Sequence, residues 1–385
     1  MNRTIYLDSH ATTPVDPRVV EVMLPFFTEH FGNASSRNHP FGWKAGKAVE
    51  QAREQVASLI GARFRDVVFT SGATESNNLA IKGIAGCAPA GRRHIITIAT
   101  EHRAVLDPSR ALERDGFLVT YLGVDREGRI DLAQLRDAVR ADTLLVSAMS
   151  ANNEIGVLHP LSEIAGIAHA QGALFHCDAV QSAGLLPLRV KELGIDLVSL
   201  SAHKMYGPKG IGALYVAKRD PAIELRALID GGGHERGYRS GTLNVPAIVG
   251  FGKAADLCLH EADSDARRLR ALRDRLWASL SQLDGAHLNG PMEPRLPNNL
   301  NVCFDDVHGE SLLKAVAGDV AVSSGAACAT ASAEPSHVLR ALGLNDEQAR
   351  ASIRFGLGRF TTAQEIDSAA EIVTGAARQL RRRPV

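Results

Sequence analysis

Short apolar runs alternate with segments of helical spacing through the middle of the chain, from about residue 61 to residue 216. Runs of β-branched and other apolar residues predict buried strands, whereas apolar positions three or four residues apart predict helices. Such an alternation predicts a mainly parallel sheet with helices on both faces, which binds ligands beyond the carboxyl ends of its strands. The predicted strands are residues 67–70, 95–100, 143–149, 173–177, 197–201 and 211–216, and the predicted helices are residues 48–60 and 161–172.

The pattern changes in the last third of the chain. Residues 247–283 carry Arg, Asp and Leu at helical spacing and predict one long helix, and residues 362–380 predict a final helix. The sequence from about residue 288 predicts a smaller α+β unit. We therefore expect a large domain, residues 15–260, which contains the sheet and its ligand-binding edge, and a small domain built from residues 1–14 and 261–385.

Composition excludes several classes of protein. The chain is 45% hydrophobic and 22% charged, as in ordinary globular enzymes. Lys plus Arg and Asp plus Glu number 43 each, so the charge balance predicts neither a nucleic acid nor an anionic membrane as partner. With no membrane-spanning apolar run and no signal-peptide core at the start, we expect a cytoplasmic protein. Five cysteines without a C-x-x-C pair, and no H-E-x-x-H motif, favour neither a disulfide framework nor a metal site.

Polar side chains directly follow five of the predicted strands. Any one of these groups could cap a helix or stabilise a turn, but five on one edge of a sheet predict a shared site. The small residues of the segment 71–76 start a helical pattern, and their free backbone N–H groups would favour a phosphate. The groups after the strands are residues 71–76, Glu101 and His102, residues 152–154, Asp178 and Gln181, and Ser201, His203 and Lys204.

Lys204 is the most informative of these residues. It follows the strand 197–201 and precedes a Gly-Pro-Lys-Gly turn. A lone loop lysine would be an ordinary surface residue, but Asp178 lies at the end of the preceding strand, where a carboxylate can pair with a pyridinium nitrogen. A lysine that can form a Schiff base, beside this carboxylate and phosphate donors, predicts a pyridoxal phosphate enzyme.

Cys328 is the other residue that indicates chemistry. It lies among Ser, Gly, Ala and Thr in the segment 323–335, which has no large apolar residue to anchor it. Cys177 and Cys303, by contrast, lie within strand-like runs and fit the usual role of free cysteine as a small buried hydrophobe. Because reactive thiols are accessible, the segment predicts a reactive cysteine in a surface loop.

Several motifs spread over the chain occur together in one known family. They are Tyr6-Leu-Asp-Ser-His-Ala-Thr-Thr-Pro14, Thr70-Ser-Gly-Ala-Thr-Glu-Ser76, Thr100-Glu-His102, Asn152-Asn-Glu-Ile-Gly156, Ser201-Ala-His-Lys204, Arg239-Ser-Gly-Thr242, the Cys328 segment and Ser352-Ile-Arg-Phe-Gly-Leu-Gly-Arg-Phe360. Together they resemble the pyridoxal-phosphate-dependent cysteine desulfurases of the class I, IscS/NifS-like branch, over nearly the whole chain. The resemblance implies an α/β fold, pyridoxal phosphate fold type I (aspartate aminotransferase-like), with a mainly parallel central sheet and a smaller α+β C-terminal domain.

The resemblance also implies a role for each site residue. Lys204 would bind the cofactor as a Schiff base and move the substrate α-proton, and His102 would stack on the ring as an acid–base group. Asp178 would pair with the ring nitrogen and Gln181 with the ring hydroxyl. The Cys328 thiolate would attack the sulfur of L-cysteine, leaving a persulfide and releasing alanine. The other cofactor contacts would be Ala73, Thr74, Asn153, Ser201, His203 and Thr242 of the partner subunit in a homodimer, and the substrate carboxylate would bind Asn153 and Arg354.

Two departures from the family's pattern bear on the partner. Alanines flank Cys328 where the family commonly has Ser before it and Thr or Ser after it, and the chain stops at Val385, short of the tail of many relatives. We therefore expect the sulfur to pass to an acceptor protein at the Cys328 side, either an iron–sulfur scaffold or a thiolation protein, with weaker scaffold binding than in tailed relatives. The alternatives are a selenocysteine lyase, another type I pyridoxal phosphate lyase or aminotransferase, and a binding scaffold without activity.

Overall fold

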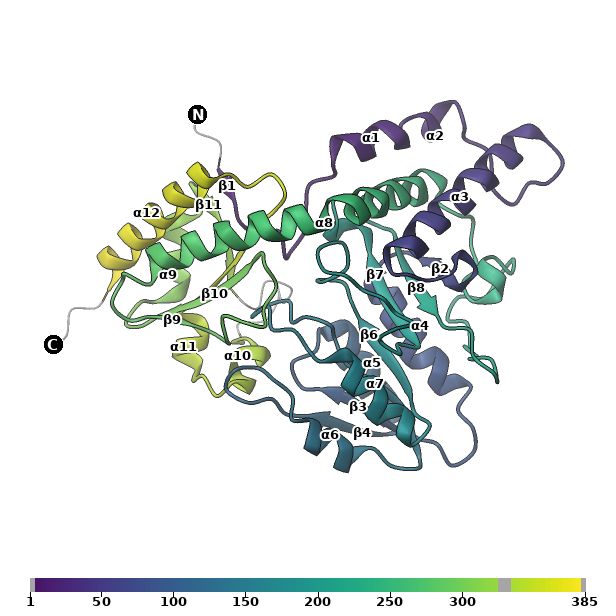
Figure 1. The fold of residues 1–385 in the computed structure, drawn as a ribbon, viewed down its shortest axis with the longest axis horizontal. Helices are drawn as coiled ribbons and strands as arrows, with labels where there is room; N and C mark the ends of the chain where they lie inside the picture. The colour runs from purple at the N-terminus through teal and green to yellow at the C-terminus, as the bar shows by residue number, and fades with distance from the viewer. Residues whose placement is uncertain (1–3, 325–333, 382–385) are drawn as a thin grey trace.

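A seven-stranded sheet forms the centre of the larger part of the molecule, in a computed structural model that describes residues 4–324 and 334–381 (Figure 1). Neighbouring strands from β4 to β7 are parallel, and β8 runs antiparallel to both of its neighbours, so the predicted mainly parallel sheet is confirmed. In sheet order the strands are β2 (Val67–Thr70), β8 (Gly212–Val216), β7 (Leu197–Ser201), β6 (Leu174–Asp178), β5 (Thr143–Ser147), β3 (His94–Ile98) and β4 (Leu118–Leu122).

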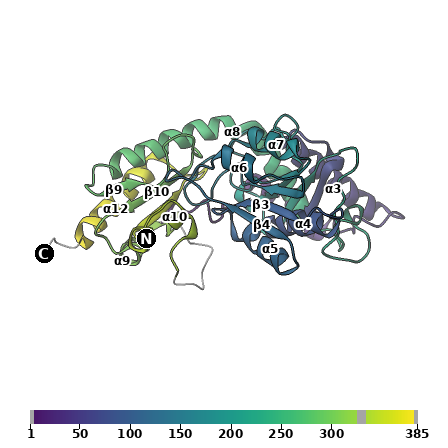
Figure 2. The ribbon, with the colours of Figure 1, turned by 90° about the horizontal axis from the view of Figure 1, so that it is seen from below.

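Helices cover both faces of this sheet, and Figure 2 shows α7 and α8 on one side of the strands and α5 on the other. Alternate strand residues point to opposite faces: Val67 and Phe69 join one apolar cluster and Val68 joins another. The first cluster includes side chains of α3 (Pro40–Leu59), α6 (Leu132–Ala138), α7 (Leu161–Ala170) and α8 (Val245–Leu280), and the second those of α4 (Ala73–Gly86) and α5 (Arg103–Arg114).

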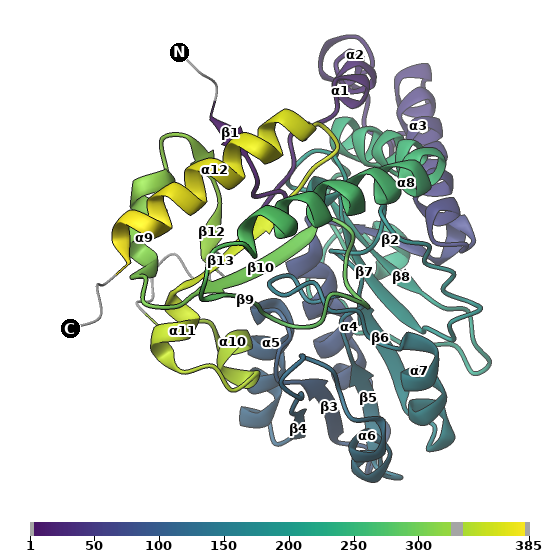
Figure 3. The ribbon, with the colours of Figure 1, turned by 60° about the vertical axis from the view of Figure 1, so that its left-hand side comes forward.

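A second, smaller unit has its own sheet and core. Its antiparallel strands follow the order β12 (Ser323–Ser324), β13 (Ser352–Gly356), β10 (Asn299–Phe304) and β9 (Ala286–Leu288), and β1 (Ile5–Tyr6) pairs in parallel with β11 (Val320–Ala321). Helices α9 (Gly309–Val316) and α12 (Ala363–Leu380) contribute to this core, and α12 lies beside α8 (Figure 3). The remaining elements are α1 (Pro17–Met23), α2 (Pro25–Thr28), α10 (His337–Ala341), α11 (Asp346–Arg350) and the 3-10 turns η1 (Phe64–Asp66), η2 (Ala202–Lys204) and η3 (Glu235–Gly237).

Helix α8 belongs to both cores. Its first part, up to Cys258, packs against the large sheet, and its last part, from Leu269, packs in the small core (Figure 1). None of the side chains from Leu259 to Arg268 is buried, as expected for a span that crosses between two cores. The predicted domain boundary between residues 260 and 261 falls within this helix, and the division itself stays a prediction.

Several predicted boundaries differ from the structure. The strands expected at 95–100 and 143–149 end at Ile98 and Ser147, because the backbone turns there to form the site edge. Helix α3 begins at Pro40 rather than residue 48, with His39 as its N-cap. The edge strand β4 was not predicted, because an edge strand is only half buried and its first residue, Leu118, is 58% exposed.

Candidate active site

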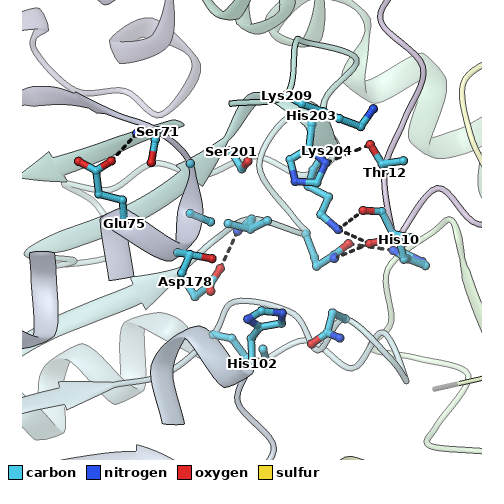
Figure 4. Close-up of a pocket in the computed structure, with 18 of the residues that line it drawn as sticks. His10, Thr12, Ser71, Glu75, His102, Asp178, Ser201, His203, Lys204 and Lys209 are labelled. Carbon is cyan, nitrogen blue, oxygen red and sulfur yellow. Dashed lines mark hydrogen bonds between the residues drawn. The ribbon is translucent and has the colours of Figure 1, made fainter. Parts of the chain in front are cut away.

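The carboxyl ends of β2, β3, β5, β6 and β7 meet at one cavity of about 470 Å³ (Figure 4). Each of the five strand ends supplies lining residues, so the polar groups expected on one edge of the sheet do border one cavity, and their shared function stays a prediction. The sequence-predicted residues that line the cavity are Ala73, Thr74, His102, Asn153, Asp178, Gln181, Ser201, His203 and Lys204.

Helix α4 begins at the cavity without a side-chain cap. Its N-cap is Gly72, with φ 151°, and Ala73 and Thr74 of the first turn line the cavity. The first amide groups of a helix have no partner within the helix and favour an anion. A β-carbon at Gly72 would meet no atom within 4 Å, so the space in front of the helix is open. The residues therefore form an open cradle of free backbone N–H groups, the kind of site that binds a phosphate.

Asp178 is held rigidly at the end of β6. Its Oδ2 accepts a hydrogen bond from Nδ2 of Asn77 at 2.7 Å, and its Oδ1 accepts one from the backbone N–H of Val180 at 3.0 Å. The residue is only 7% exposed but lines the cavity. A buried carboxylate fixed in this way can pair with a cationic ring nitrogen.

Lys204 reaches the cavity from the turn η2, directly after β7. Its amine donates to the backbone carbonyls of His10 and Ala11, the latter at 2.8 Å (Figure 4). The N-terminal segment also fixes the backbone of this turn, because Thr13 donates its N–H to the His203 carbonyl at 3.0 Å. The lysine position is therefore set by a segment almost two hundred residues away in sequence.

The contacts and burial of three histidines around the cavity determine where their protons lie. His102 is the N-cap of α5, and its Nδ1 accepts a hydrogen bond from the Ala104 N–H at 3.0 Å, so the neutral ring carries its proton on Nε2. Burial, reinforced by the charge of Lys204, lowers the pKa of His203 to about 4. Burial, together with Arg354, lowers the pKa of His10 to about 3. His10 and His203 are therefore neutral at physiological pH.

Arg354 lies behind the cavity wall and is not among the residues that line it. The side chain is 1% exposed; Nη1 donates to the Asn153 carbonyl and Nη2 to Oδ1 of Asp8, both at 3.0 Å. The structure thus joins Asn153 and Arg354, the two residues expected to bind a carboxylate, through a backbone contact. It also adds Asp8, which belongs to the Tyr6–Pro14 motif but had no predicted role of its own.

Besides Arg354, two expected residues do not appear in the cavity. Cys328 lies outside the described residues. Thr242 is exposed and does not line the cavity. Its segment is nevertheless tied to the site, since Arg239 forms an ion pair with Glu75, a lining residue, at 3.0 Å.

Sequence reasoning missed residues that support the site from outside the strand ends. Asn77, in the second turn of α4, holds Asp178 and had no predicted role. Glu101 was predicted only as one of the polar groups at the strand ends. It is fully buried, and burial, reinforced by the nearby Asp178, raises the pKa of its carboxyl well above the usual range. His10 Nδ1 donates to Oε1 of Gln181 at 2.9 Å. The quoted sequence motifs include His10 and Glu101 but not Asn77.

Comparison with known proteins gives the class of protein. The family profile described as Aminotransferase class-V matches residues 5–368. The chain therefore belongs to the class-V aminotransferase family, which depends on pyridoxal phosphate, and it has the type I fold expected from the sequence. The uncapped start of α4, the fixed Asp178 carboxylate and the Lys204 amine fit this cofactor.

Individual relatives narrow the class to the cysteine desulfurases. A protein named cysteine desulfurase IscS from Anaeromyxobacter sp. (strain Fw109-5) is 59% identical over 382 residues, which cover 99% of this chain and 94% of that protein. A solved NifS-like protein matches with a TM-score of 0.92 at 38% identity, covering 98% of this chain and 100% of its own. A structure titled "SspA in complex with cysteine" matches with a TM-score of 0.82 at 37% identity, covering 93% and 100%.

The described part of the chain has neither a membrane-spanning helix nor a group of metal ligands. No helix within residues 4–324 and 334–381 is both long and apolar enough to cross a membrane. Over the same residues, no group of three or more His, Cys, Asp and Glu side chains is arranged to hold a metal ion.

Proposed function

We propose that the protein removes the sulfur of L-cysteine, releases L-alanine and carries the sulfur as a persulfide on Cys328. The observation that supports this most directly is the convergence of Lys204, Asp178 and the uncapped start of α4 on one cavity, in a chain related over nearly its whole length to cysteine desulfurases. Bound pyridoxal phosphate supplies an electron-withdrawing ring that lets bonds at the amino acid's Cα break.

Different residues of the cavity would bind different parts of this cofactor. The first turn of α4, with Ala73 and Thr74, and the side chains of Ser201 and His203 would hold the phosphate, helped by Thr242 of the partner subunit. Asp178 would keep the ring nitrogen protonated, because a buried carboxylate stabilises a nearby positive charge. Gln181, already bonded to His10, would meet the ring hydroxyl.

Lys204 and His102 would move the protons. Lys204, whose amine lies in the cavity, would take the α-proton of the substrate and deliver it where alanine forms. His102 presents a neutral ring with its proton on Nε2, and it would hold this proton toward the substrate sulfur as a hydrogen-bond donor while negative charge develops there. Both side chains line the same cavity.

The substrate carboxylate would bind Arg354 and Asn153. A guanidinium offers a planar fork that matches a carboxylate. Arg354 is buried, and its Nε has no hydrogen-bond partner among the described residues, so donor capacity remains for a ligand. Cys328 then attacks the substrate sulfur: the Cβ–S bond breaks as the S–S bond of the persulfide forms.

The test is product analysis with L-cysteine. We expect wild-type protein to release alanine and, with a reducing thiol, sulfide, and Cys328→Ser to keep its bound cofactor while losing nearly all sulfide release. The serine control separates chemistry at the thiol from cofactor binding. Sulfide release that is unchanged in Cys328→Ser would mean that this thiol is not the acceptor and would favour a direct lyase. The same assay with L-selenocysteine tests the selenocysteine lyase alternative, which the relatives do not favour.

The composite site implies a homodimer. Six large apolar side chains within residues 20–43 are exposed, which is costly on a monomer surface and typical of an interface; they are Val20, Leu24, Phe27, Phe31, Phe41 and Trp43. The segment with Thr242 is anchored by a buried ion pair of Arg53 and Glu235 at 2.6 Å. An anchored loop can cross to a neighbour's site without losing its shape.

The acceptor of the sulfur would be a protein in the cytoplasm. The name of the relatives supports iron–sulfur cluster assembly as the leading destination, with thiolation of tRNA as the next. We expect the acceptor to dock on the side of the molecule that carries residues 323–335. No direct contact with nucleic acid or membrane is part of this proposal.

A further inference from the structure

Three segments distant in sequence meet at Arg354. Ser323 of β12 lies opposite Arg354 of β13 in the antiparallel register, and Asp8 forms a bridge with Gly356 two residues further along β13. The backbone of Asp8 is itself fixed, because the Tyr6 hydroxyl donates to the Asp8 carbonyl at 3.1 Å. The position of the Asp8 carboxylate beside Arg354 is therefore built into the sheet.

The ion pair between Asp8 and Arg354 uses only one of the two carboxylate oxygens of Asp8. Asp8 uses one oxygen, Oδ1, which accepts from Arg354 Nη2 and from the Ser323 hydroxyl, both at 3.0 Å. The Asp8 side chain is 21% exposed, whereas that of Arg354 is 1% exposed. One oxygen shared between two donors, on a side chain that solvent can reach, makes a contact that a competing carboxylate can displace.

The buried pair of Arg53 and Glu235 shows what a purely structural contact looks like in the same molecule. There both carboxylate oxygens accept from separate guanidinium nitrogens, at 2.6 and 2.8 Å, and the side chains are 5% and 2% exposed. Such a fork-to-fork pair is the strong arrangement. Arg354 lacks such a two-oxygen pair, and its buried Nε has no partner within the part of the chain that the structure describes. A buried donor without an acceptor costs free energy, which a ligand can offset by supplying that acceptor.

We propose that Asp8 is a resident carboxylate that competes with the carboxylate of the amino acid for Arg354. It keeps the guanidinium charge compensated while the site is empty, and it weakens the hold on product so that L-alanine can leave. Asp8 is thus a positioning residue that sets affinity, and the inference rests on the proposed role of Arg354 as the carboxylate-binding group.

The experiment is calorimetric titration of L-alanine into the cofactor-loaded protein. In Asp8→Asn the shape and the hydrogen-bond acceptor remain but the competing charge is gone, so we expect alanine to bind about tenfold more tightly. Steady-state kinetics with L-cysteine should show a lower KM together with a lower kcat, because product release slows. Alanine affinity that is unchanged or weaker in Asp8→Asn overturns the inference.

Two other variants keep the result interpretable. Asp16→Asn removes another carboxylate of the N-terminal segment that pairs with an arginine, Arg359 at 3.0 Å, and should leave alanine affinity within about twofold. Ser323→Ala frees the shared oxygen for Arg354 and should weaken alanine binding; tighter binding there would also contradict the inference. If Asp8→Asn unfolds, the alanine affinity of Ser323→Ala still tests the direction of the effect.

Arg354→Gln separates this inference from the proposed function. Loss of alanine binding in Arg354→Gln with no change in Asp8→Asn leaves the carboxylate site in place and removes only the role of Asp8. Alanine binding that survives in Arg354→Gln shows instead that the carboxylate binds elsewhere, and the proposed substrate site is then wrong.

Discussion

Buried histidines show how differently one residue type is used in this fold. His176, in β6, bonds the hydroxyls of Ser147 and Ser199 with its two ring nitrogens at 2.8 and 3.0 Å, so it ties three strands together. His159 is also buried, yet neither ring nitrogen has a hydrogen-bond partner among the described residues. Burial lowers the pKa of His176 to about 3 and that of His159 to about 4.

These shifts predict a loss of stability in mild acid. The unfolded chain binds a proton at each of these histidines near pH 6.5, whereas the folded protein does so only below about pH 4, so stability falls as pH drops between these values. In His159→Leu the free energy of unfolding should depend less steeply on pH, by the equivalent of about one proton. At pH 8 the substitution should change this free energy little, because no hydrogen bond is lost. Urea unfolding at pH 5 and pH 8 measures both effects.

His176→Leu is the matched control for that experiment. It removes the same titrating ring but leaves two buried hydroxyls without partners, which should cost about 2–5 kcal/mol at every pH. An equal cost at pH 8 for both histidines would contradict our account of His159.

At the scale of elements, the start of α4 and strand β8 determine the shape of the phosphate cradle. Gly72 has open space where a β-carbon would stand, whereas a β-carbon at Gly212 would lie 2.5 Å from the Leu200 carbonyl oxygen and 2.6 Å from the Gly72 Cα. The first glycine leaves room for a ligand, and the second lets two strands and a helix end approach each other.

Gly72→Ala and Gly212→Ala should therefore fail in different ways. In Gly72→Ala the methyl group enters the cradle and the backbone is strained at φ 151°, so cofactor affinity should fall about tenfold or more with a modest loss of stability. Gly212→Ala should cost several kcal/mol of stability, because backbone atoms must move apart. Cofactor titration and thermal melting of the apoprotein separate the two. A larger stability loss in Gly72→Ala than in Gly212→Ala would argue against the cradle.

Elements and site were predictable from sequence to different degrees. The strand-end residues could be predicted because parallel strands put consecutive polar groups on one edge, so His102, Asp178 and Lys204 needed only the strand pattern. The roles of Asn77 and Asp8 could not be predicted, because each residue contacts a segment far away in the sequence. Asn77 donates to Asp178 and Asp8 pairs with Arg354, and no local pattern indicates either contact. Strand β4 was missed because a half-exposed edge strand carries a weak apolar signal, and the start of α3 because its first turns are mostly exposed.

At the scale of the whole molecule, the exposed apolar side chains of residues 20–43 and the proposed contribution of Thr242 to a neighbour's site both predict a homodimer. Phe27 and Phe31 are 59% and 65% exposed. The double variant Phe27→Glu/Phe31→Glu should be monomeric in analytical ultracentrifugation and should bind the cofactor more weakly, since the partner's Thr242 is then absent. Leu118→Glu, a change at an equally exposed residue of the edge strand β4, should stay dimeric. A wild-type monomer that binds the cofactor fully would refute the dimer.

The 36 residues of α8 form one uninterrupted helix, about 54 Å long at about 1.5 Å per residue. Its exposed middle is clamped by ion pairs of Arg18 with Glu261 and of Arg359 with Asp265. One end of α8 packs in each of the two apolar cores. If one core unfolds, the half of α8 that it holds is no longer fixed, and the other core loses the support of a continuous helix. The two parts of the molecule are therefore a single cooperative unit, and a fragment cut at the sequence boundary near residue 260 would end in mid-helix with its apolar face uncovered.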